Sequence, residues 1–281
     1  MIDMTSQKKN QIYISKRLMR VAELVGRADC LADIGTDHGY LPIYLIQYGI
    51  VKRCIAMDLR DEPLRRAKNH MIEAGVLDRV DLRISDGFEK LKKGEADAVT
   101  ITGMGGRLMS DILLAGKDHM ELGTHLVLSP QSDYTYFRNF LFHNGFAVKK
   151  EHIIREAEKT YFIYDVTYEG LVYGRSQLAK KYLGYVNDYI SLLDKEETGH
   201  EEIDAEKISY EILCMFGANL LEENNVYDKK ILLREIEKTD KVIKQLAMIK
   251  DTSLDIELRK RQMDERMICL MISKNIMEVE Q

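Results

Sequence analysis

Residues 33–42, with the sequence DIGTDHGYLP, combine carboxylates, a histidine and glycines in a pattern suited to holding a small molecule. They follow a short apolar run, and Gly35 and Gly39 allow the backbone to turn sharply and to come close to a ligand. Pro42 fits the first turn of a helix, because the N–H that proline lacks has no partner there. A strand, a glycine-rich turn and a helix form a typical nucleotide-binding loop. The same turn also occurs in proteins without any ligand, so evidence from the rest of the chain is needed to show whether this one binds a ligand.

The second carboxylate of this segment argues against a dinucleotide. In the G-x-G-x-x-G fingerprint the second glycine lets a pyrophosphate approach, but here Asp37 takes its place. A pyrophosphate would meet a negative charge, so a cofactor without phosphates fits better. The spacing from Asp33 onward resembles the first motif of S-adenosylmethionine-dependent methyltransferases, whose cofactor has no phosphates.

Two further carboxylates follow later apolar runs. Asp58 ends the second run, 23 residues beyond Gly35, where nucleotide-binding folds place an acid that accepts hydrogen bonds from both ribose hydroxyls. Asp86 follows the third run, and in methyltransferases a residue at this place contacts the adenine of the cofactor. Either acid alone has an ordinary explanation as a turn or helix cap. Their places at matching strand ends, with the neighbours Leu59 and Gly87, favour cofactor contacts.

The fourth apolar run leads into residues 103–106, with the sequence GMGG. Enzymes that methylate amino groups usually carry an Asn/Asp-Pro-Pro-aromatic motif here, and this chain lacks it. Glycines let backbone approach a flat substrate but offer no general base. A ring nitrogen with an exposed lone pair, such as N1 of adenine, needs no base, and positioning then supplies most of the rate. A carboxylate such as Asp37 can stabilise the cationic product, and His38 can hold the base. The candidate catalytic residues are Asp37, His38, Met104 and Gly105.

The elements that must position these residues alternate between strands and helices from residue 28 to residue 170. The expected strands are Cys30–Ile34, Arg53–Met57, Arg79–Ile84, Ala96–Ile101 and His125–Leu128. The expected helices are 41–48, 62–74, 107–114 and 134–144. Two more strands, 146–154 and 160–168, follow without a helix between them and predict a hairpin. Parallel strands that end in a hairpin resemble the seven-stranded class I methyltransferase sheet, so the predicted fold is α/β and Rossmann-like.

Helical periodicity replaces this alternation from Tyr173 onward. Apolar residues over 232–246 and 263–270 form the seam of a short coiled coil, and the short link at 251–253 favours an antiparallel pair. The seam can close within one chain or between two, which leaves the oligomeric state open. We therefore expect a methyltransferase domain over 1–170 and an all-α, antiparallel coiled-coil domain over 171–281.

The composition is that of a soluble globular protein, with 281 residues, 45% of them hydrophobic and 31% charged. There is no apolar signal core and no stretch near the roughly 18 apolar residues of a membrane span, so a cytoplasmic protein without a membrane partner is expected. The four cysteines lack C-x-x-C spacing, which argues against a zinc site and a disulfide framework, and no metal is expected.

The net charge of −5 is unevenly placed. Residues 171–281 hold 17 basic and 22 acidic residues, whereas residues 1–170 are neutral overall and begin with a basic segment, 1–27. Its basic residues are Lys8, Lys9, Lys16, Arg17, Arg20 and Arg27, against Asp3 and Glu23. The segment is either a phosphate-binding surface or the solvated face of a helix that Ser15 caps.

Three segments together carry a specific resemblance: DIGTDHGYLP, the GMGG after the fourth strand, and the Ser-Pro-Gln at 129–131. The chain resembles the bacterial tRNA (adenine-N1)-methyltransferases, which methylate an adenosine in the D-arm and carry a C-terminal coiled coil. Residues 171–204 look like extra sequence within this family. The resemblance implies S-adenosyl-L-methionine as cofactor and tRNA as partner. Candidate cofactor-binding residues are Asp33, Gly35, Thr36, Gly39, Asp58, Leu59, Asp86, Gly87 and Gly103. Candidate substrate-binding residues are Lys16, Arg17, Arg20, Tyr40, Gly106, Pro130 and Gln131.

Because N1 lies on the Watson–Crick edge, the target base must leave its stack, and a stacking surface is expected beside the pocket. The candidates are Tyr40, Met104, Tyr134 and Phe137. Other functions stay open: a methyltransferase with a small-molecule or protein acceptor, a catalytically silent tRNA-binding protein, and a nucleotide-sugar or NAD enzyme. Asp37 argues against the last of these.

Overall fold

The structure is a computed structural model that describes residues 11–192, 204–217, 226–249, 251 and 253–279. The described residues do not include Lys8, Lys9, part of the 171–204 segment, or residue 252 of the predicted link between two helices. The chain divides into two compact units, Met1–Val172 and Tyr173–Gln281. The sequence places this boundary after residue 170. Each unit is described by itself.

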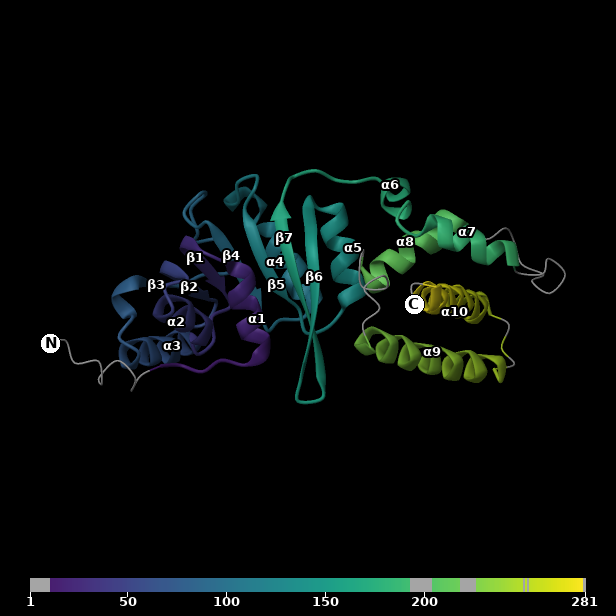
Figure 1. The fold of residues 1–281 in the computed structure, drawn as a ribbon, viewed down its shortest axis with the longest axis horizontal. Coiled ribbons are helices and arrows are strands. Elements are labelled where there is room, and N and C mark those ends of the chain that lie inside the picture. The colour runs from purple at the N-terminus through teal and green to yellow at the C-terminus, as the bar shows by residue number, and fades with distance from the viewer. Residues whose placement is uncertain (1–10, 193–203, 218–225, 250, 252, 280–281) are drawn as a thin grey trace. The chain divides into compact units, whose positions relative to one another are not determined.

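The first unit is built on one seven-stranded sheet in the order β3-β2-β1-β4-β5-β7-β6 (Figure 1). Its strands are β1 (Ala28–Ile34), β2 (Val51–Asp58), β3 (Val80–Ile84), β4 (Ala98–Thr102), β5 (His125–Ser129), β6 (Phe146–Glu156) and β7 (Lys159–Tyr168). Strands β1 to β5 pair in parallel, and β7 inserts antiparallel between β5 and β6. The predicted Rossmann-like methyltransferase sheet, including its closing hairpin, is confirmed.

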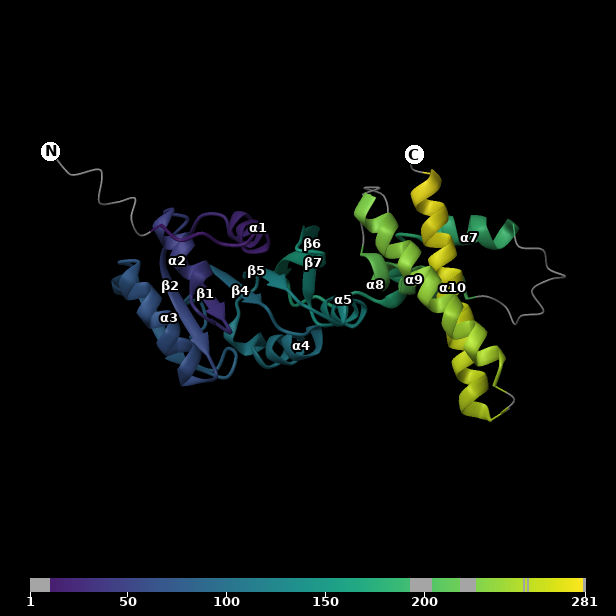
Figure 2. The same ribbon diagram turned by 90° about the horizontal axis from the view of Figure 1, so that it is seen from below.

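Five helices cover the two faces of this sheet. They are α1 (Lys16–Val25), α2 (Tyr40–Gln47), α3 (Asp61–Glu73), α4 (Gly106–Ala115) and α5 (Tyr134–His143). Two short 3₁₀ helices, Leu77–Arg79 and Lys117–His119, complete the unit. Helices α1 and α2 pack on one face, where α3 continues the row, and α4 and α5 pack together on the other (Figure 2). This two-sided cover explains why successive residues of the central strands β1, β4 and β5 are buried rather than alternately buried and exposed.

Strand order reverses between β1 and β4, which are neighbours in the sheet although β2 and β3 lie between them in sequence. The helix after β1 and the helix after β4 therefore leave toward opposite faces and open a crevice at the carboxyl ends of these strands. The loops 35–39 and 103–105 start at this crevice. The topology thus brings the two glycine-rich segments of the sequence together.

The hairpin β6–β7 extends beyond the sheet at the same carboxyl edge. Strand β7 pairs with β5 only over Tyr164–Thr167, whereas it pairs with β6 along its whole length. Residues 152–163 consequently form a two-stranded arm, which Figure 1 shows extending past the neighbouring strand ends. The arm turns at Ala157 and Glu158, both of which have positive φ, as a tight hairpin turn requires.

Helix α1 is tied to this arm. Ser15 caps the helix as predicted, since its Oγ accepts a hydrogen bond from the Leu18 N–H. The Lys16 N–H donates to the Glu156 carboxylate at 2.8 Å, and Arg20 donates from Nη2 to Nδ1 of His152 at 3.0 Å. The start of α1 is therefore fixed to the carboxyl edge of the sheet.

A buried ion pair anchors β6 to α5. Arg138 and Glu151 are buried, and Nε of Arg138 donates to Glu151 at 2.9 Å. Replacing Glu151 with leucine leaves a buried guanidinium without its counter-ion, so we expect the free energy of unfolding in urea to fall by about 3–5 kcal/mol. The double replacement of Glu151 and Arg138 with leucine is expected to cost less than this single change. A single variant with the urea midpoint and slope of the parent would contradict the assignment.

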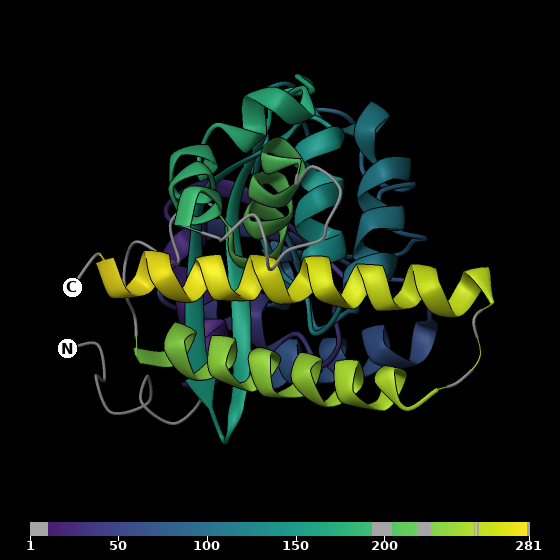
Figure 3. The same ribbon diagram turned by 90° about the vertical axis from the view of Figure 1, so that its right-hand side faces the viewer.

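The second unit is all-α, with helices α6 (Arg175–Ala179), α7 (Leu183–Leu192), α8 (Ala205–Phe216), α9 (Val226–Ala247) and α10 (Leu254–Val279). Helices α9 and α10 lie side by side and run in opposite directions, as Figure 3 shows. Arg266 of α10 pairs with Glu235 of α9 at 2.9 Å. Helices α6 and α7, which belong to the apparently extra segment, pack on α8, and the Tyr182 hydroxyl donates to the Gly217 carbonyl at 2.7 Å. The described part of this segment therefore contributes buried residues to the helical unit, among them Ala179, Tyr182 and Val186.

Two composition-based expectations can be compared with the described residues. All four cysteines are buried and free. Among the helices that the structure describes, none has the length and apolar character needed to cross a membrane.

Candidate cofactor and base-binding site

A cavity of about 410 Å³ opens at the carboxyl edge, beside the ends of β1, β2 and β4. Its lining comes from five separate segments of the chain, which the fold brings together. The lining residues are Arg17, Leu18, Asp33, Gly35, Asp37, Tyr40, Leu41, Pro42, Asp58, Arg60, Thr102, Gly103, Met104 and Gln131. The cavity thus collects three of the four candidate acids and two of the six candidate glycines that the sequence indicated.

Asp33 is the buried penultimate residue of β1, and its carboxylate is hydrogen-bonded within the protein. The hydroxyls of Thr36 and Thr100 donate to its two oxygens, each at 2.7 Å. Burial raises the pKa of Asp33, and the two hydrogen bonds lower it again. Thr36 is itself buried, so its contribution is to hold Asp33 and the glycine turn in shape.

Gly35, in the loop after β1, has a backbone conformation that favours glycine and packs closely against the loop after β4. Gly35 has φ +79°, and its N–H and that of Thr36 both donate to the Met57 carbonyl at 2.8 Å. A Cβ on Gly35 would lie 2.0 Å from Cε of Met104. Any side chain at this position would be strained by the positive φ and would also displace the end of the Met104 side chain.

Asp58 is positioned to present a carboxylate to the cavity. Its side chain is only 12% exposed, and Oδ1 accepts a hydrogen bond from the Arg60 N–H at 2.8 Å. The Asp58 carbonyl accepts from the Ser85 N–H at 3.0 Å, which places the loop after β3 alongside. Asp86 is exposed on that loop, and Gly87 packs close to Ile112 of α4, but neither lines the cavity.

Arg17 lies in the cavity wall, although the sequence analysis assigns it to RNA. Its guanidinium lies over the Tyr161 ring, 5.2 Å from the centroid, and Nη1 is buried without a hydrogen-bond partner in the described part of the chain. Burial lowers the pKa of Arg17. A partly buried cation with an unused donor is suited to binding an anionic group of a ligand.

The turn after Gly35 places an acid and aromatic rings at the cavity. Asp37 and Tyr40 line it, and Tyr40 is 39% exposed. His38 has φ +60°, an uncommon conformation for a residue with a Cβ, and its ring stacks on Tyr40 with 5.3 Å between centroids. Nε2 of His38 lies 3.6 Å from Asp37 Oδ2. His38 is thus next to the cavity without lining it.

The GMGG segment divides between the cavity and the core. Gly103 and Met104 line the cavity, and the Met104 carbonyl accepts from the Gln131 N–H at 2.8 Å, so the segment after β5 joins the site. Gly105 caps α4. Gly106 is buried, and a Cβ there would lie 2.7 Å from the Ser132 carbonyl oxygen. Gly106 therefore packs α4 against a loop rather than facing a substrate.

Other predicted residues lie outside the cavity. Leu59 is 62% exposed, Lys16 is exposed on α1, and Pro130 is buried after β5. The prediction that Phe137 stacks on a base is wrong, because its side chain is completely buried against the edge of Tyr164. Tyr134 is partly buried, and its hydroxyl donates to the Gln131 carbonyl at 3.1 Å.

Comparison with known proteins agrees with this geometry. Residues 14–164 match the family model described as a methyltransferase domain. The chain is 33% identical to the tRNA (adenine(22)-N(1))-methyltransferase of Bacillus subtilis over 235 residues, which is 81% of this chain and 98% of the relative. This chain belongs to the tRNA (adenine-N1)-methyltransferase family.

Solved structures of this family cover both units of the chain. The crystal structure of the Bacillus subtilis tRNA methyltransferase superposes with a TM-score of 0.75 at 27% identity, over 94% of this chain and 99% of that one. A Streptococcus pneumoniae protein proposed to be a tRNA methyltransferase gives 0.70 at 25% identity, over 93% and 99%. The tRNA (adenine-N1)-methyltransferase family thus includes the C-terminal helices as well as the sheet.

Two residues of α3 near the site were missed by the sequence analysis. Arg66 donates from Nη2 to Asp37 Oδ1 at 3.0 Å, and Nδ1 of His70 lies 2.8 Å from the His38 carbonyl oxygen. Their spacing of four residues places both on one helix face. That spacing says nothing about the turn some thirty residues earlier in the chain, so the sequence contained no signal for the contact.

Proposed function

We propose that this protein transfers the methyl group of S-adenosyl-L-methionine to N1 of an adenine in the D-arm of tRNA. One observation carries the proposal: a single cavity joins Asp58, a desolvated Arg17 and the backbone of Gly103 and Met104. The relatives named as tRNA (adenine(22)-N(1))-methyltransferases support the reaction and the acceptor. Because these relatives act on tRNA, the proposal also places the protein in the cytoplasm.

The residues of the cavity match the charges of the cofactor, which supplies a methyl group on a positively charged sulfur. Asp58 accepts hydrogen bonds from the two ribose hydroxyls, as acids at this strand end do. Arg17 binds the carboxylate of the methionine moiety, and Gly35 keeps the backbone close. The Streptococcus pneumoniae protein has been crystallised in complex with S-adenosyl-L-methionine.

The acceptor side needs positioning rather than a base. The N1 lone pair forms the new N–C bond while the S–C bond breaks, so no proton leaves the adenine and the base becomes cationic. Asp37 faces this charge from the cavity wall and stabilises it as it develops. Tyr40 provides an exposed ring against which the base stacks once it has left its own stack.

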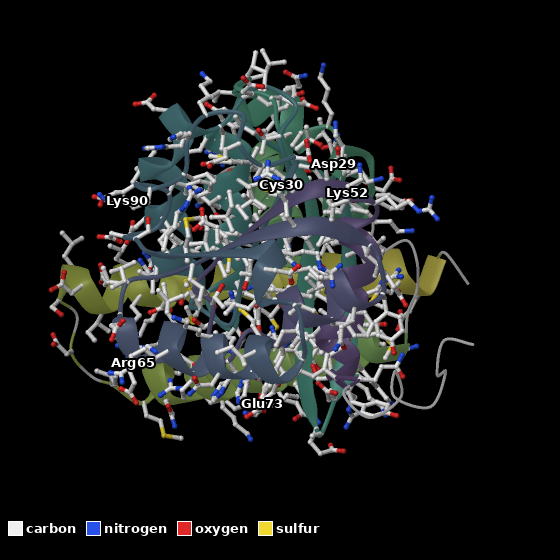
Figure 4. The ribbon with its side chains drawn as sticks, turned by 90° about the vertical axis from the view of Figure 1, so that its left-hand side faces the viewer. Asp29, Cys30, Lys52, Arg65, Glu73 and Lys90 are labelled. Atoms are coloured by element: carbon white, nitrogen blue, oxygen red, sulfur yellow. The ribbon has the colours of Figure 1, made fainter. Side chains whose placement is uncertain are left out.

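The basic start of α1 contributes to RNA binding through Lys16, which is exposed next to the carboxyl edge. We expect Lys16→Glu to weaken tRNA binding and to flatten its dependence on salt, because a phosphate contact releases counter-ions. Filter binding at several salt concentrations measures both effects. Lys52→Glu is the control, because Lys52 lies exposed at the amino end of the sheet beside Asp29 (Figure 4). Equal losses of tRNA affinity in Lys16→Glu and Lys52→Glu would contradict a specific contact between Lys16 and the RNA.

The decisive experiment incubates the protein with methyl-labelled cofactor and bulk tRNA and then maps the modified nucleoside. We expect N1-methyladenosine in tRNA, and no label in a transcript whose target adenosine is replaced by guanosine. Binding of the cofactor without label transfer to tRNA would favour a small-molecule or protein acceptor. Binding of tRNA without cofactor binding would favour a catalytically silent RNA-binding protein.

A further inference from the structure

Helix α3 runs along the outer side of the turn that contains Asp37 and His38. Residues Glu62, Arg66 and His70 recur every four positions and share one face of the helix. The helix packs directly on the turn, because a Cβ on Gly39 would lie 2.7 Å from Cε of Met71. This close packing holds α3 against the turn, so that side chains on the neighbouring face of the helix can reach it.

The first contact fixes the backbone of the turn. His38 and Gly39 both have positive φ, at +60° and +72°, and the carbonyl of His38 accepts a hydrogen bond from Nδ1–H of His70 at 2.8 Å. A left-handed residue with a Cβ persists only when its surroundings hold it there. The hydrogen bond from His70 is such a restraint.

The second contact joins three aromatic rings. The His70 ring lies nearly parallel to those of His38 and Tyr40, with centroid distances of 5.7 and 5.3 Å. The His38 and Tyr40 rings are also nearly parallel, at 5.3 Å. His70 therefore supports, from behind, the aromatic surface that contains Tyr40, the exposed ring at the cavity.

The third contact holds the carboxylate. Arg66 binds Asp37 through Nη2 at 3.0 Å and Glu62 through Nη1 at 2.6 Å, so its guanidinium is fixed at two points. The hydrogen bond with Asp37 raises the pKa of Arg66. The orientation of the Asp37 carboxylate is thus set from α3, outside the cavity.

We propose that Arg66 and His70 are positioning residues for methyl transfer, which hold Asp37, His38 and Tyr40 in the arrangement that receives the target adenine. The proposal rests on the function proposed above and extends it to a helix that does not line the cavity. Both residues act through the turn, so they are expected to affect the chemical step with tRNA and to leave cofactor binding intact.

Four single variants separate these contributions. His70→Phe keeps a ring but removes the donor, and His70→Asn keeps a donor near the position of Nδ1. Arg66→Met removes the guanidinium, and Arg65→Met is the matched control. The Arg65 side chain is 78% exposed, and its Nη1 lies 3.8 Å from Asp61, one turn earlier on the same helix (Figure 4).

For each variant, kcat with saturating tRNA and cofactor is measured together with the dissociation constant of S-adenosylmethionine. Because misplacement of reacting groups by about 1 Å costs up to about a hundredfold in rate, we expect His70→Phe and Arg66→Met to lower kcat by about ten- to a hundredfold. The cofactor dissociation constant is expected to stay within about twofold, which also shows that the variants are folded. His70→Asn should recover most of the rate, and Arg65→Met should match the parent.

A double-mutant cycle tests the link through Asp37. In an Asp37→Asn background, Arg66→Met should cause little further loss, because the partner is already changed. Parental rates for His70→Phe and Arg66→Met would overturn the proposal, and so would losses of cofactor affinity as large as the losses of rate. If the parent protein binds the cofactor but does not methylate tRNA, the proposed function has failed, and the role given to Arg66 and His70 falls with it.

Discussion

Replacing Asp58 with alanine is expected to lower the affinity for S-adenosylmethionine by about a hundredfold or more. The Asp58 carboxylate is largely shielded from water and lines the cavity at the end of β2. Two hydrogen bonds from ribose hydroxyls to an ionised acid contribute about 1.5–3 kcal/mol each. Every 1.4 kcal/mol is about tenfold in affinity, so the loss of both is easily measured.

Isothermal titration calorimetry with the purified full chain measures this loss. Asp29→Ala is a suitable control, because Asp29 lies at the amino end of the sheet, exposed and paired with Lys52 at 2.7 Å (Figure 4). An exposed pair of this kind contributes little to stability. If Asp58→Ala bound the cofactor as tightly as Asp29→Ala, the cavity would not be the cofactor site.

Replacing Arg17 with methionine is expected to remove the ability to recognise the carboxylate of the cofactor. The parent protein should bind decarboxylated S-adenosylmethionine about ten- to a hundredfold more weakly than S-adenosylmethionine, which corresponds to one charged hydrogen-bonding contact. The Arg17→Met variant should bind both compounds with the same, weaker affinity. The reason is that Nη1 of Arg17 is buried in the cavity wall without another partner in the described part of the chain.

Measuring the affinity of both compounds for the parent and for Arg17→Met distinguishes recognition of the carboxylate from a general effect of the substitution on folding. A variant that still preferred the carboxylated compound as strongly as the parent would refute the assignment. If Arg17→Met left cofactor affinity unchanged and weakened tRNA binding, Arg17 would belong to the RNA-binding surface that the sequence analysis proposed.

The strand ends were the part of the site that could be predicted from the sequence. Asp33, Asp58 and the GMGG segment follow apolar runs, and parallel strands bring their carboxyl ends to one edge. The order of the strands then determines which loops meet. For this reason the cavity contains residues from segments that are far apart in the chain but follow adjacent strands.

Side-chain direction and close packing could not be predicted in the same way. The helical pattern of α1 identifies an apolar face but does not tell which cation at its border lines the cavity, so the position of Arg17 in the cavity wall could not be predicted. Gly106 and Phe137 occur next to functional segments, and only the packing of α4 and α5 shows that both are buried. Arg66 and His70 act on a turn that is remote in sequence.

Arg17 and Leu18 form part of the cavity wall, and this limits how the protein can be divided into fragments. All seven strands lie after residue 27, and a truncation that begins at the first strand retains the whole sheet. Such a truncation would nevertheless lack one side of the cavity and the helix that covers this part of the sheet. The shortest fragment that keeps a complete cavity must therefore include Ser15, the N-cap of α1, and start at or ahead of that residue.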